Sequence, residues 1–358
     1  MNCWSGIRED DSLNHPLVST PVQSVAILRA ARTWRQEGRR VALATVVRTW
    51  GSSPRPIGSM LAVDENFDML GSVSGGCVEG VTAAAAVEII RTGGSRVLTF
   101  DVSREQGLDV GLSCAGRIEV CIERFDELDD PLSCDVVDSV LGHHDADRGA
   151  VLACRLADRK RTTVTEDDCS ALGDAARVAM TADRSETVAV EGEPWLLQVF
   201  MPPRRLVVIG ASDIAQALSV MASSIGYAVI VLDPRSAFAS EKRFPGMEIL
   251  PVWPDKGLDA LGLGSRTAVI TLSHDPKLDD PALARALASE VFYVGALGSR
   301  RTHANRMERL RQSGLAQEAL SRIRAPIGLN IGAREPAEIA LAILAEIVQT
   351  ARQPGTHS

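Results

Sequence analysis

The second half of the chain alternates short apolar segments with segments of helical periodicity, and no other feature constrains the fold as strongly. The apolar segments RLVVIGA, YAVIVLDP, TAVITLS and VFYVGALG are rich in β-branched residues, while IAQALSVMASSIG and the C-terminal segment have the character of helices. Strands that alternate with helices in this way form a parallel sheet covered on both faces. The pattern therefore predicts a Rossmann-like, doubly wound domain over residues 203–358.

The first half has a different pattern and predicts a separate α/β domain. A helix in VQSVAILRAARTWRQ ends before Gly38, and a second helix, VTAAAAVEIIRT, ends at Gly93 and Gly94. Strands are predicted in VALATVVRT, MLAVDE, RVLTFDV, RIEVCIERF, GAVLACRLA and ETVAVEGEPWLLQVFMPP. We expect a flexible tail over residues 1–20 and an α/β domain over 21–202, which ends where Pro202 and Pro203 interrupt the chain.

Length and charge exclude several classes of function. The 358 residues suffice for two domains, and the formal net charge of -8 argues against binding of nucleic acid. No segment approaches the roughly 18 apolar residues of a membrane helix, and the N-terminal residues lack the apolar core of a signal peptide. We expect a cytoplasmic protein with no membrane partner.

The seven cysteines are expected to be reduced thiols. Their number is odd and they form no CxxC pair, so neither a disulfide framework nor a structural zinc site is expected. Two of them, Cys77 and Cys114, lie in glycine-rich sequence. The remaining five are interpreted as core or surface thiols: Cys3, Cys121, Cys134, Cys154 and Cys169.

The segment RLVVIGASDIAQAL is the strongest local signal for a nucleotide-like ligand. An apolar strand turns at Gly210 directly into a helix, and about 20 residues later Asp233 ends a second strand, where dinucleotide-binding folds place a carboxylate for a ribose hydroxyl. Ser212, however, occupies the position of the glycine that lets the backbone approach a pyrophosphate. Binding of NAD(P) and a fold with a different ligand, or none, therefore both remain open.

Two further strand ends offer polar groups at the edge where such sheets bind ligands. In GALGSRR, the glycines Gly295 and Gly298 precede a helix that begins with Arg300 and Arg301, a combination suited to a phosphate or carboxylate. Two solvated arginines at an ordinary helix start are the alternative. His274 lies at another strand end and is either a ligand or a turn residue, and the aspartates that follow it include a helix cap rather than a metal site.

The segment GSVSGGCVEG carries the sharpest chemistry of the first domain. Gly75, Gly76 and Cys77 precede a predicted helix, whose dipole favours a thiolate able to bind a metal or carry sulfur. The same amides are suited to a phosphate, and Glu79 is expected either to orient the turn or to act as an acid or base. The alternative is that Cys77 is a small buried hydrophobic residue.

Two other loops of the first domain carry candidate residues. Arg55 lies between two prolines that stiffen its loop, which suits a guanidinium held for an anion, although an exposed loop arginine is equally compatible. Cys114 in GLSCAG is a thiol in a setting similar to that of Cys77. The sequence leaves open whether the two thiols face one pocket.

Taken together, these segments resemble the XdhC/CoxI family of maturation factors for molybdenum hydroxylases. The resemblance rests on ATVVRTWGSSPRPIGSMLAV, GSVSGGCVEG, GLSCAGRIEV, LSHDPKLDDPAL, YVGALGSRRTHANR and APIGLNIGAREPAEIALAILAEI, and extends from about residue 21 to 350. It implies that the chain holds molybdenum cofactor during sulfuration with a cysteine desulfurase and inserts it into a client such as xanthine dehydrogenase or carbon monoxide dehydrogenase. It also implies that Cys77 is a molybdenum ligand or sulfur relay, with Cys114 second.

The chain departs from the family pattern at two places, and alternatives follow. GASDIA stands where GAGHVA is frequent, and GLSCAG stands where sequences such as GLCGG are frequent. The alternatives are an NAD(P)-dependent oxidoreductase and a non-catalytic module that recruits a desulfurase. Xanthine dehydrogenase itself is excluded, because the chain has no iron–sulfur cysteine arrays. The C-terminal helix either forms a homodimer or covers the sheet.

Overall fold

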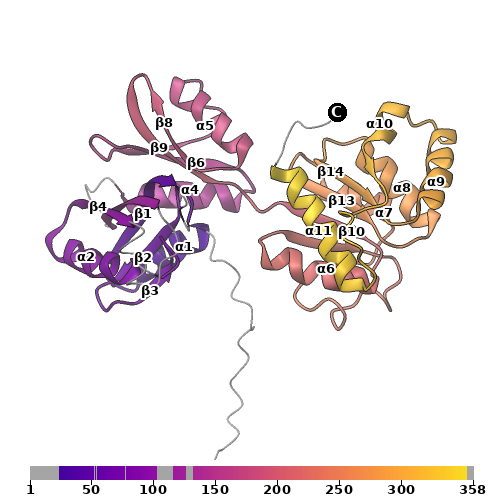
Figure 1. Cartoon of the computed structure of the whole chain (residues 1–358), viewed down its shortest axis with the longest axis horizontal. Helices are drawn as coiled ribbons and strands as arrows, with labels where there is room; N and C mark the ends of the chain where they lie inside the picture. Colours follow the sequence, from indigo (N-terminus) through magenta and orange to yellow (C-terminus); the bar gives the residue numbers. More distant parts are fainter. Residues whose placement is uncertain are drawn as a thin grey trace, which may run out of the picture.

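The protein has a mixed α/β architecture in two halves, with antiparallel sheets in the N-terminal half and a parallel sheet in the C-terminal half (Figure 1). This arrangement confirms the predicted fold class. The computed structural model describes residues 24–51, 53, 55–76, 78–102, 116–125 and 132–352.

A five-stranded antiparallel sheet begins the N-terminal half. Its strands lie in the order β3-β2-β1-β5-β4. Their bounds are β1 (Val41–Gly51), β2 (Met60–Asp64), β3 (Met69–Gly71), β4 (Ser95–Val102) and β5 (Gly116–Phe125). Side chains of β1 are buried on both faces, which explains its continuous apolar sequence. Leu43 joins a core with helix α1 (Ser24–Gln36), and Ala44 joins a core with helix α2 (Glu79–Thr92) on the opposite face.

A second, four-stranded antiparallel sheet completes this half, in the order β7-β6-β9-β8. Its elements are α4 (Cys134–Asp145), β6 (Ala150–Arg155), β7 (Arg161–Val164), α5 (Ala171–Ala182), β8 (Glu186–Val190) and β9 (Glu193–Phe200). The sequence did not predict β7 or α5. The segment ETVAVEGEPWLLQVFMPP folds as a hairpin, because Glu191 and Gly192 turn the chain with φ of 52° and 85°.

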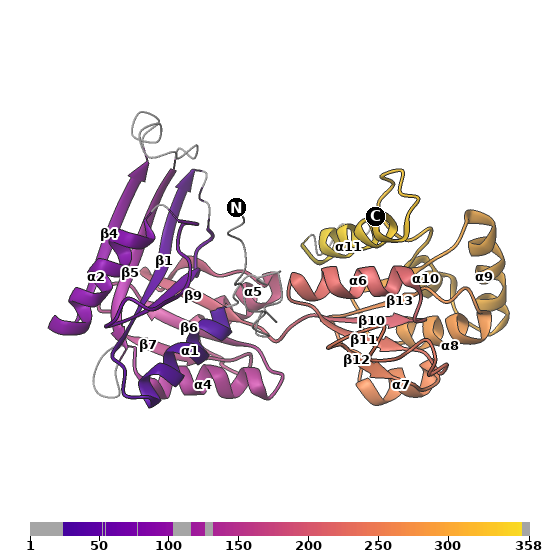
Figure 2. The ribbon, with the colours of Figure 1, turned by 90° about the horizontal axis from the view of Figure 1, so that it is seen from below.

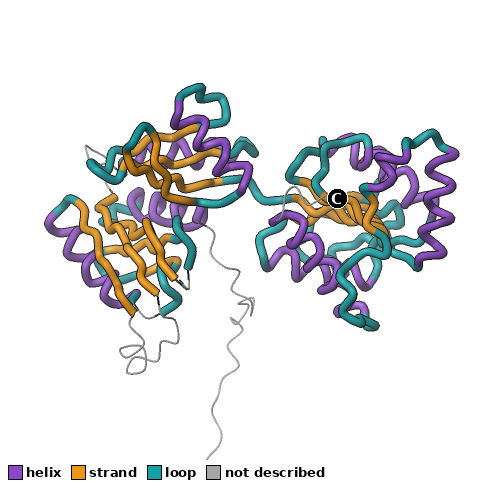
Figure 3. The backbone as a smooth tube through the Cα atoms, turned by 45° about the horizontal axis from the view of Figure 1, so that its top comes forward, coloured by secondary structure: helices purple, strands orange, loops and turns teal. Residues whose placement is uncertain are grey.

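A buried ion pair joins the two antiparallel sheets. Arg161 of β7 forms a salt bridge with Glu123 of β5 and donates to Gln198 Oε1 on β9 at 3.3 Å. Burial opposes a charge on Arg161, but the Glu123 carboxylate outweighs this effect and raises the pKa of the guanidinium. The two sheets therefore form one packed unit, visible as neighbouring groups of strands in Figure 3.

The C-terminal half is a six-stranded parallel sheet in the order β12-β11-β10-β13-β14-β15. Its elements are β10 (Arg205–Ile209), α6 (Asp213–Ser224), β11 (Ala228–Leu232), β12 (Glu248–Leu250), α7 (Pro254–Leu261), β13 (Thr267–Thr271), α8 (Pro276–Leu287), β14 (Tyr293–Ala296), α9 (Arg300–Gln312), α10 (Gln317–Ser321), β15 (Ile323–Arg324) and α11 (Pro336–Arg352). Helices α6 and α11 cover one face, and α7 and α8 cover the other (Figure 2). The strand order reverses between β10 and β13, where ligands of doubly wound sheets bind.

The terminal helix α11 packs against α6 and contributes buried residues such as Ile343 and Ile347 to the core. Of the two roles predicted for this helix, the packing matches the cover of the sheet. Leu341 on the same helix is 52% exposed. Within the described ranges, no helix has the length and apolar character needed to cross a bilayer.

Candidate functional site

The loops that carry the candidate residues of the first domain leave the five-stranded sheet at one end. At this end β1 finishes at Gly51, which pairs with Gly116 at the start of β5, and Gly116 also pairs with Val102 at the end of β4. The end of β3, Gly71, pairs with Leu61 near the start of β2. Strands β1 and β4 therefore end side by side, whereas β3 ends level with Ala44 of β1, because Leu61 pairs with both Gly71 and Ala44. Residues Cys77 and Cys114 lie outside the described residues.

The turn between β3 and α2 is organised around the carboxylate of Glu79. Oε1 accepts hydrogen bonds from Ser72 Oγ (2.7 Å), Val73 N (3.3 Å), Ser74 N (2.9 Å) and Gly75 N (3.0 Å), and Oε2 accepts from Ser74 Oγ (2.7 Å) and Gly76 N (2.8 Å). Gly75 and Gly76 have φ of 93° and 129°, values that L side chains rarely adopt. The sequence S-V-S-G-G-x-x-E therefore builds an anion-binding turn and fills it with its own carboxylate.

The hydrogen bonds of Glu79 bear on the roles considered for its carboxylate and for the amides of the turn. Burial opposes the charge on Glu79, but the hydrogen bonds from Ser74 and Ser72 outweigh it and lower the pKa from 4.5 to about 2. A carboxylate that stays ionised near neutral pH is poorly suited to donate a proton. These interactions match the role in which Glu79 orients the turn. The backbone N–H groups of Gly75 and Gly76 already donate to Glu79, so they are not free to donate to a phosphate.

Arg55 is the cation nearest in sequence to the end of β1 within the described loop. Its carbonyl accepts a hydrogen bond from Ser53 Oγ at 2.7 Å, and the following turn is fixed where Gly58, with φ of 85°, lies against Ser185. Arg55 Nε is buried and has no hydrogen-bond partner among the described residues. A buried donor without a partner is costly in a native structure, so this guanidinium is available to an anion.

In the C-terminal half the topology brings the candidate residues to the carboxyl edge of the parallel sheet. Gly210 follows β10 with φ of 99°, and a Cβ at this position would lie 2.8 Å from the backbone of Ser273, which follows β13. The glycine is therefore required by the close approach of two strand ends. Ser212, in place of the second glycine, caps α6 by accepting a hydrogen bond from Ala215 N at 3.3 Å. This cap explains the departure from the dinucleotide pattern.

Asp233 does not present the free carboxylate that was expected for a ribose hydroxyl. The side chain is buried and accepts hydrogen bonds from Ala211 N (2.9 Å) and from Arg235 N, Nε and Nη2 (2.9, 2.8 and 2.6 Å). Burial raises the pKa of Asp233, but the bonds from Arg235 and Ala211 lower it more, so the net shift is downward. The protein's own Arg235 therefore binds the carboxylate that was considered for a ribose hydroxyl.

The loops after β13 and β14 contain the remaining candidates. His274 has φ of 61° in the turn before α8, which is capped by Asp275, as predicted for the aspartates of this segment. Gly295 lies inside β14, where a Cβ would lie 2.4 Å from Ile327, so this glycine serves packing. Gly298 has φ of 137° before the helix α9, and the exposed Arg300 begins that helix.

The sequence analysis missed a buried arginine at this edge. Arg306 on α9 is 2% exposed, lies 3.4 Å from the buried carboxylate of Asp279 and donates to Leu297 O at 2.9 Å. Ser273 Oγ donates to the same carboxylate at 2.6 Å, and burial raises the pKa of Asp279. Arg306 Nε and Nη1 lack partners in the described part of the chain. No sequence signal marks this residue, because α9 has the polar composition of a surface helix.

Comparison with known proteins identifies the family to which the chain is similar. A sequence model of the XdhC Rossmann domain matches residues 206–347, and one of the XdhC and CoxI family matches residues 34–101. The chain is 30% identical over 325 residues to the molybdenum cofactor insertion chaperone PaoD of Escherichia coli (strain K12), and the match covers 90% of this chain and 86% of that protein. It is 26% identical over 336 residues to a probable subunit of xanthine dehydrogenase from Bacillus subtilis (strain 168), covering 89% and 95% respectively.

A solved structure supports the fold. The crystal structure of a xanthine dehydrogenase from Bacillus halodurans has 24% sequence identity and a TM-score of 0.72, over 93% of this chain and 97% of that one. At this level of identity the likeness concerns the arrangement of the chain. With the two matched regions and the relative from Escherichia coli, the chain belongs to the XdhC and CoxI family.

Proposed function

We propose that this chain binds molybdenum cofactor, protects it and inserts it into a molybdenum hydroxylase, and so acts as a maturation factor. The observation that carries the proposal is the 30% identity, over 86% of its length, to a protein named as a molybdenum cofactor insertion chaperone. The matches to both family models, over residues 34–101 and 206–347, also support the maturation role.

We propose that the cargo binds to the loops at the end of the five-stranded sheet. Molybdenum cofactor is an anionic pterin with a phosphate and a sulfur-bound metal, and it calls for cationic donors and a soft ligand such as a thiolate. Arg55 supplies a guanidinium whose Nε lacks a partner in the described structure. The turn held by Glu79 leads directly into Cys77, which we propose as the molybdenum ligand or sulfur relay, with Cys114 as a second thiol.

The proposal includes two partners. The cofactor would be sulfurated with a cysteine desulfurase and passed to a client of the xanthine dehydrogenase or carbon monoxide dehydrogenase kind. An NAD(P)-dependent oxidoreductase is less well supported, because Arg235 occupies the carboxylate of Asp233 and Ser212 serves as a helix cap. Homodimerisation through the exposed side of α11 is a further proposal, which sedimentation of the pure protein tests.

Anaerobic binding of molybdenum cofactor to the pure, full-length protein tests the carrier role. Native protein and the variants Cys77→Ala, Cys114→Ala and Arg55→Gln are mixed with cofactor and desalted, and the bound pterin is measured by fluorescence after oxidation. Cys169→Ala is the matched control, because Cys169 is an exposed thiol in the loop between β7 and α5. We expect stoichiometric retention in the native and control proteins and loss in Cys77→Ala.

Two results would redirect the interpretation. If no protein retains pterin while a desulfurase is still bound, the chain is a recruiting module and the carrier proposal fails. If the pure protein reduces NAD with xanthine in the absence of any partner, the chain is an oxidoreductase. Transfer is tested separately by mixing the loaded protein with cofactor-free hydroxylase and measuring the appearance of hydroxylase activity.

A further inference from the structure

A cavity of about 1180 Å³ lies between the two halves of the chain, at the amino edge of the parallel sheet. Arg204, Arg266 and Arg322 each directly precede a strand, namely β10, β13 and β15. The opposite wall comes from α5, with Thr181 among its lining residues. The cavity is therefore at the other edge of the sheet from Gly210 and Asp233, and it is distinct from the loops that carry Arg55.

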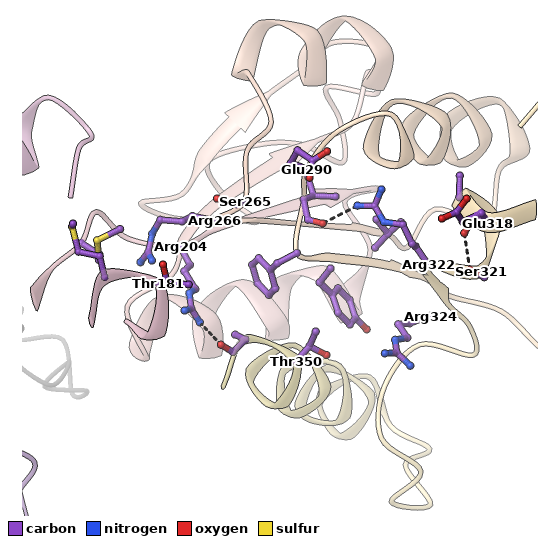
Figure 4. Close-up of a pocket in the computed structure, with 18 of the residues that line it drawn as sticks. Thr181, Arg204, Ser265, Arg266, Glu290, Glu318, Ser321, Arg322, Arg324 and Thr350 are labelled. Carbon is purple, nitrogen blue, oxygen red and sulfur yellow. Dashed lines mark hydrogen bonds between the residues drawn. The ribbon is translucent and has the colours of Figure 1, made fainter. Parts of the chain in front are cut away.

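Four of the five arginines that line this cavity form two groups at its ends (Figure 4). At one end Arg204 and Arg266 share a single carboxylate, that of Asp183, at 3.0 and 3.3 Å. At the other end lie Arg322 and Arg324. Burial lowers the pKa of Arg266, and the neighbouring charge of Arg204 adds to this effect, although Asp183 opposes it. Guanidinium groups held side by side in this way are stabilised by an anion.

At the second end, neither Arg322 nor Arg324 forms a salt bridge with a carboxylate of the described residues. Arg322 donates to the carbonyls of Leu287, Ser289 and Val291 at 3.0, 3.1 and 2.9 Å, and no carboxylate forms a salt bridge with it in the described chain. Arg324 pairs with Gly295 through the backbone of β15, and its exposed side chain makes no hydrogen bond to the described residues. Three glutamates also line the cavity, but none of them pairs with these arginines.

The remaining lining adds an aromatic surface and hydroxyl groups. Phe292 is half-buried in the wall, and the guanidinium carbon of Arg204 lies 5.7 Å from the centroid of its ring. Ser265 and Thr350 supply hydroxyl groups. The volume is in the range that encloses an organic ligand of drug size or slightly larger. Cations beside an aromatic ring are the groups that recognise a phosphate ester joined to a planar heterocycle.

We propose that this cavity binds a phosphorylated ligand with a planar heteroaromatic ring, either a nucleotide or the pterin phosphate of the cargo, between the two halves of the chain. Arg322 and Arg324 hold the anionic group, and Phe292, which lies beside Arg204, contacts the ring. Because Thr181 and Arg266 belong to different halves, the ligand also fixes the halves relative to each other.

Isothermal titration of the full-length protein with AMP, and pterin retention after desalting, test the proposal and distinguish its two sources. The first variant is Arg324→Gln, because an exposed side chain without hydrogen bonds can be changed without loss of the fold. The second is Ser265→Glu, which places a competing carboxylate beside Arg266 from another exposed position. The control, Arg285→Gln, removes an exposed arginine of α8 that pairs with Asp259 outside the cavity.

We expect each cavity variant to bind the ligand about 10-fold more weakly or worse, as for the loss of a charge-assisted contact, and the control to bind within about 2-fold of the native protein. Binding of AMP alone identifies a nucleotide site, and loss of pterin retention in the cavity variants identifies the cargo. The proposal is overturned if neither ligand binds, if both cavity variants bind as the native protein does, or if inorganic phosphate binds as tightly as AMP.

Discussion

Replacement of Glu79 by glutamine tests whether the turn before Cys77 is built by a carboxylate. The pKa of Glu79 falls from 4.5 to about 2 on folding, which corresponds to roughly 3 kcal/mol if it is fully expressed. Because the group is only partly buried, solvent screening reduces the expected loss in Glu79→Gln to about 1–2 kcal/mol. An amide keeps one acceptor oxygen but places two N–H donors against the donors of Ser74 and Gly76.

The same shift fixes the pH dependence. The folded pKa lies below the unfolded one, so the stabilisation is complete above about pH 4.5 and is lost as the pH falls toward 2. Hydrogen exchange at the amides of residues 73–76 should be roughly 10-fold faster in Glu79→Gln at pH 7. Glu88→Gln is the control, because Glu88 lies on the same helix as Glu79 and, among the described residues, pairs only with the exposed Arg96 of β4. This variant should leave the exchange at these amides unchanged. Equal exchange in native protein and Glu79→Gln would refute the argument.

Three further substitutions test the rest of the structure. Gly210→Ala should cost about 2–4 kcal/mol in urea unfolding, because φ is 99° and the added Cβ lies 2.8 Å from Ser273; a loss below about 0.5 kcal/mol contradicts the close approach. Arg161→Met should cost about 3–5 kcal/mol by leaving the buried Glu123 unpaired, and the double change Arg161→Met with Glu123→Leu should recover most of it. Asp233→Asn should cost about 1–3 kcal/mol at pH 7 and progressively less in acid, as the native carboxylate is protonated; thermal unfolding between pH 7 and 3 measures this.

The periodicity of the sequence predicts most of the fold because each element has one dominant environment. Strand β1 is buried on both faces and reads as a continuous apolar segment, while the alternation of β10, α6 and β11 leaves only a parallel sheet as a solution. Helix α5 and strand β7 were not predicted. β7 is a four-residue strand, RTTV, whose buried Arg161 is stabilised by Glu123 of another sheet rather than by local sequence.

The sequence predicts which residues lie at the strand ends of the candidate site, but it does not show what each of them contacts. A glycine at a strand end is compatible with a bound ligand and with close packing against the protein itself. Only the residues that contact it in the folded structure distinguish the two cases, and these are often distant in the sequence. Gly295 faces Ile327, and the carboxylate of Asp233 is bonded by Arg235, two residues further along the chain. The serine and glycine residues around Glu79 predict a turn suited to an anion, but the sequence does not show that the donors of this turn bond to the protein's own carboxylate.

The cavity between the two halves was not predicted from the sequence, because the two edges of the parallel sheet differ in the sequence patterns that mark them. At the carboxyl edge, ligand-binding sequences have a known spacing, and in this chain the cap at Ser212 and the pair of Asp233 with Arg235 satisfy groups that a dinucleotide would otherwise contact. At the amino edge, single arginines precede separate strands, so Arg204 and Arg322 are more than 100 residues apart and share no motif. At the carboxyl edge the chain thus satisfies the groups at Ser212 and Asp233 that a dinucleotide would contact, whereas at the amino edge Arg322 and Arg324 form no salt bridge with a carboxylate of the described residues.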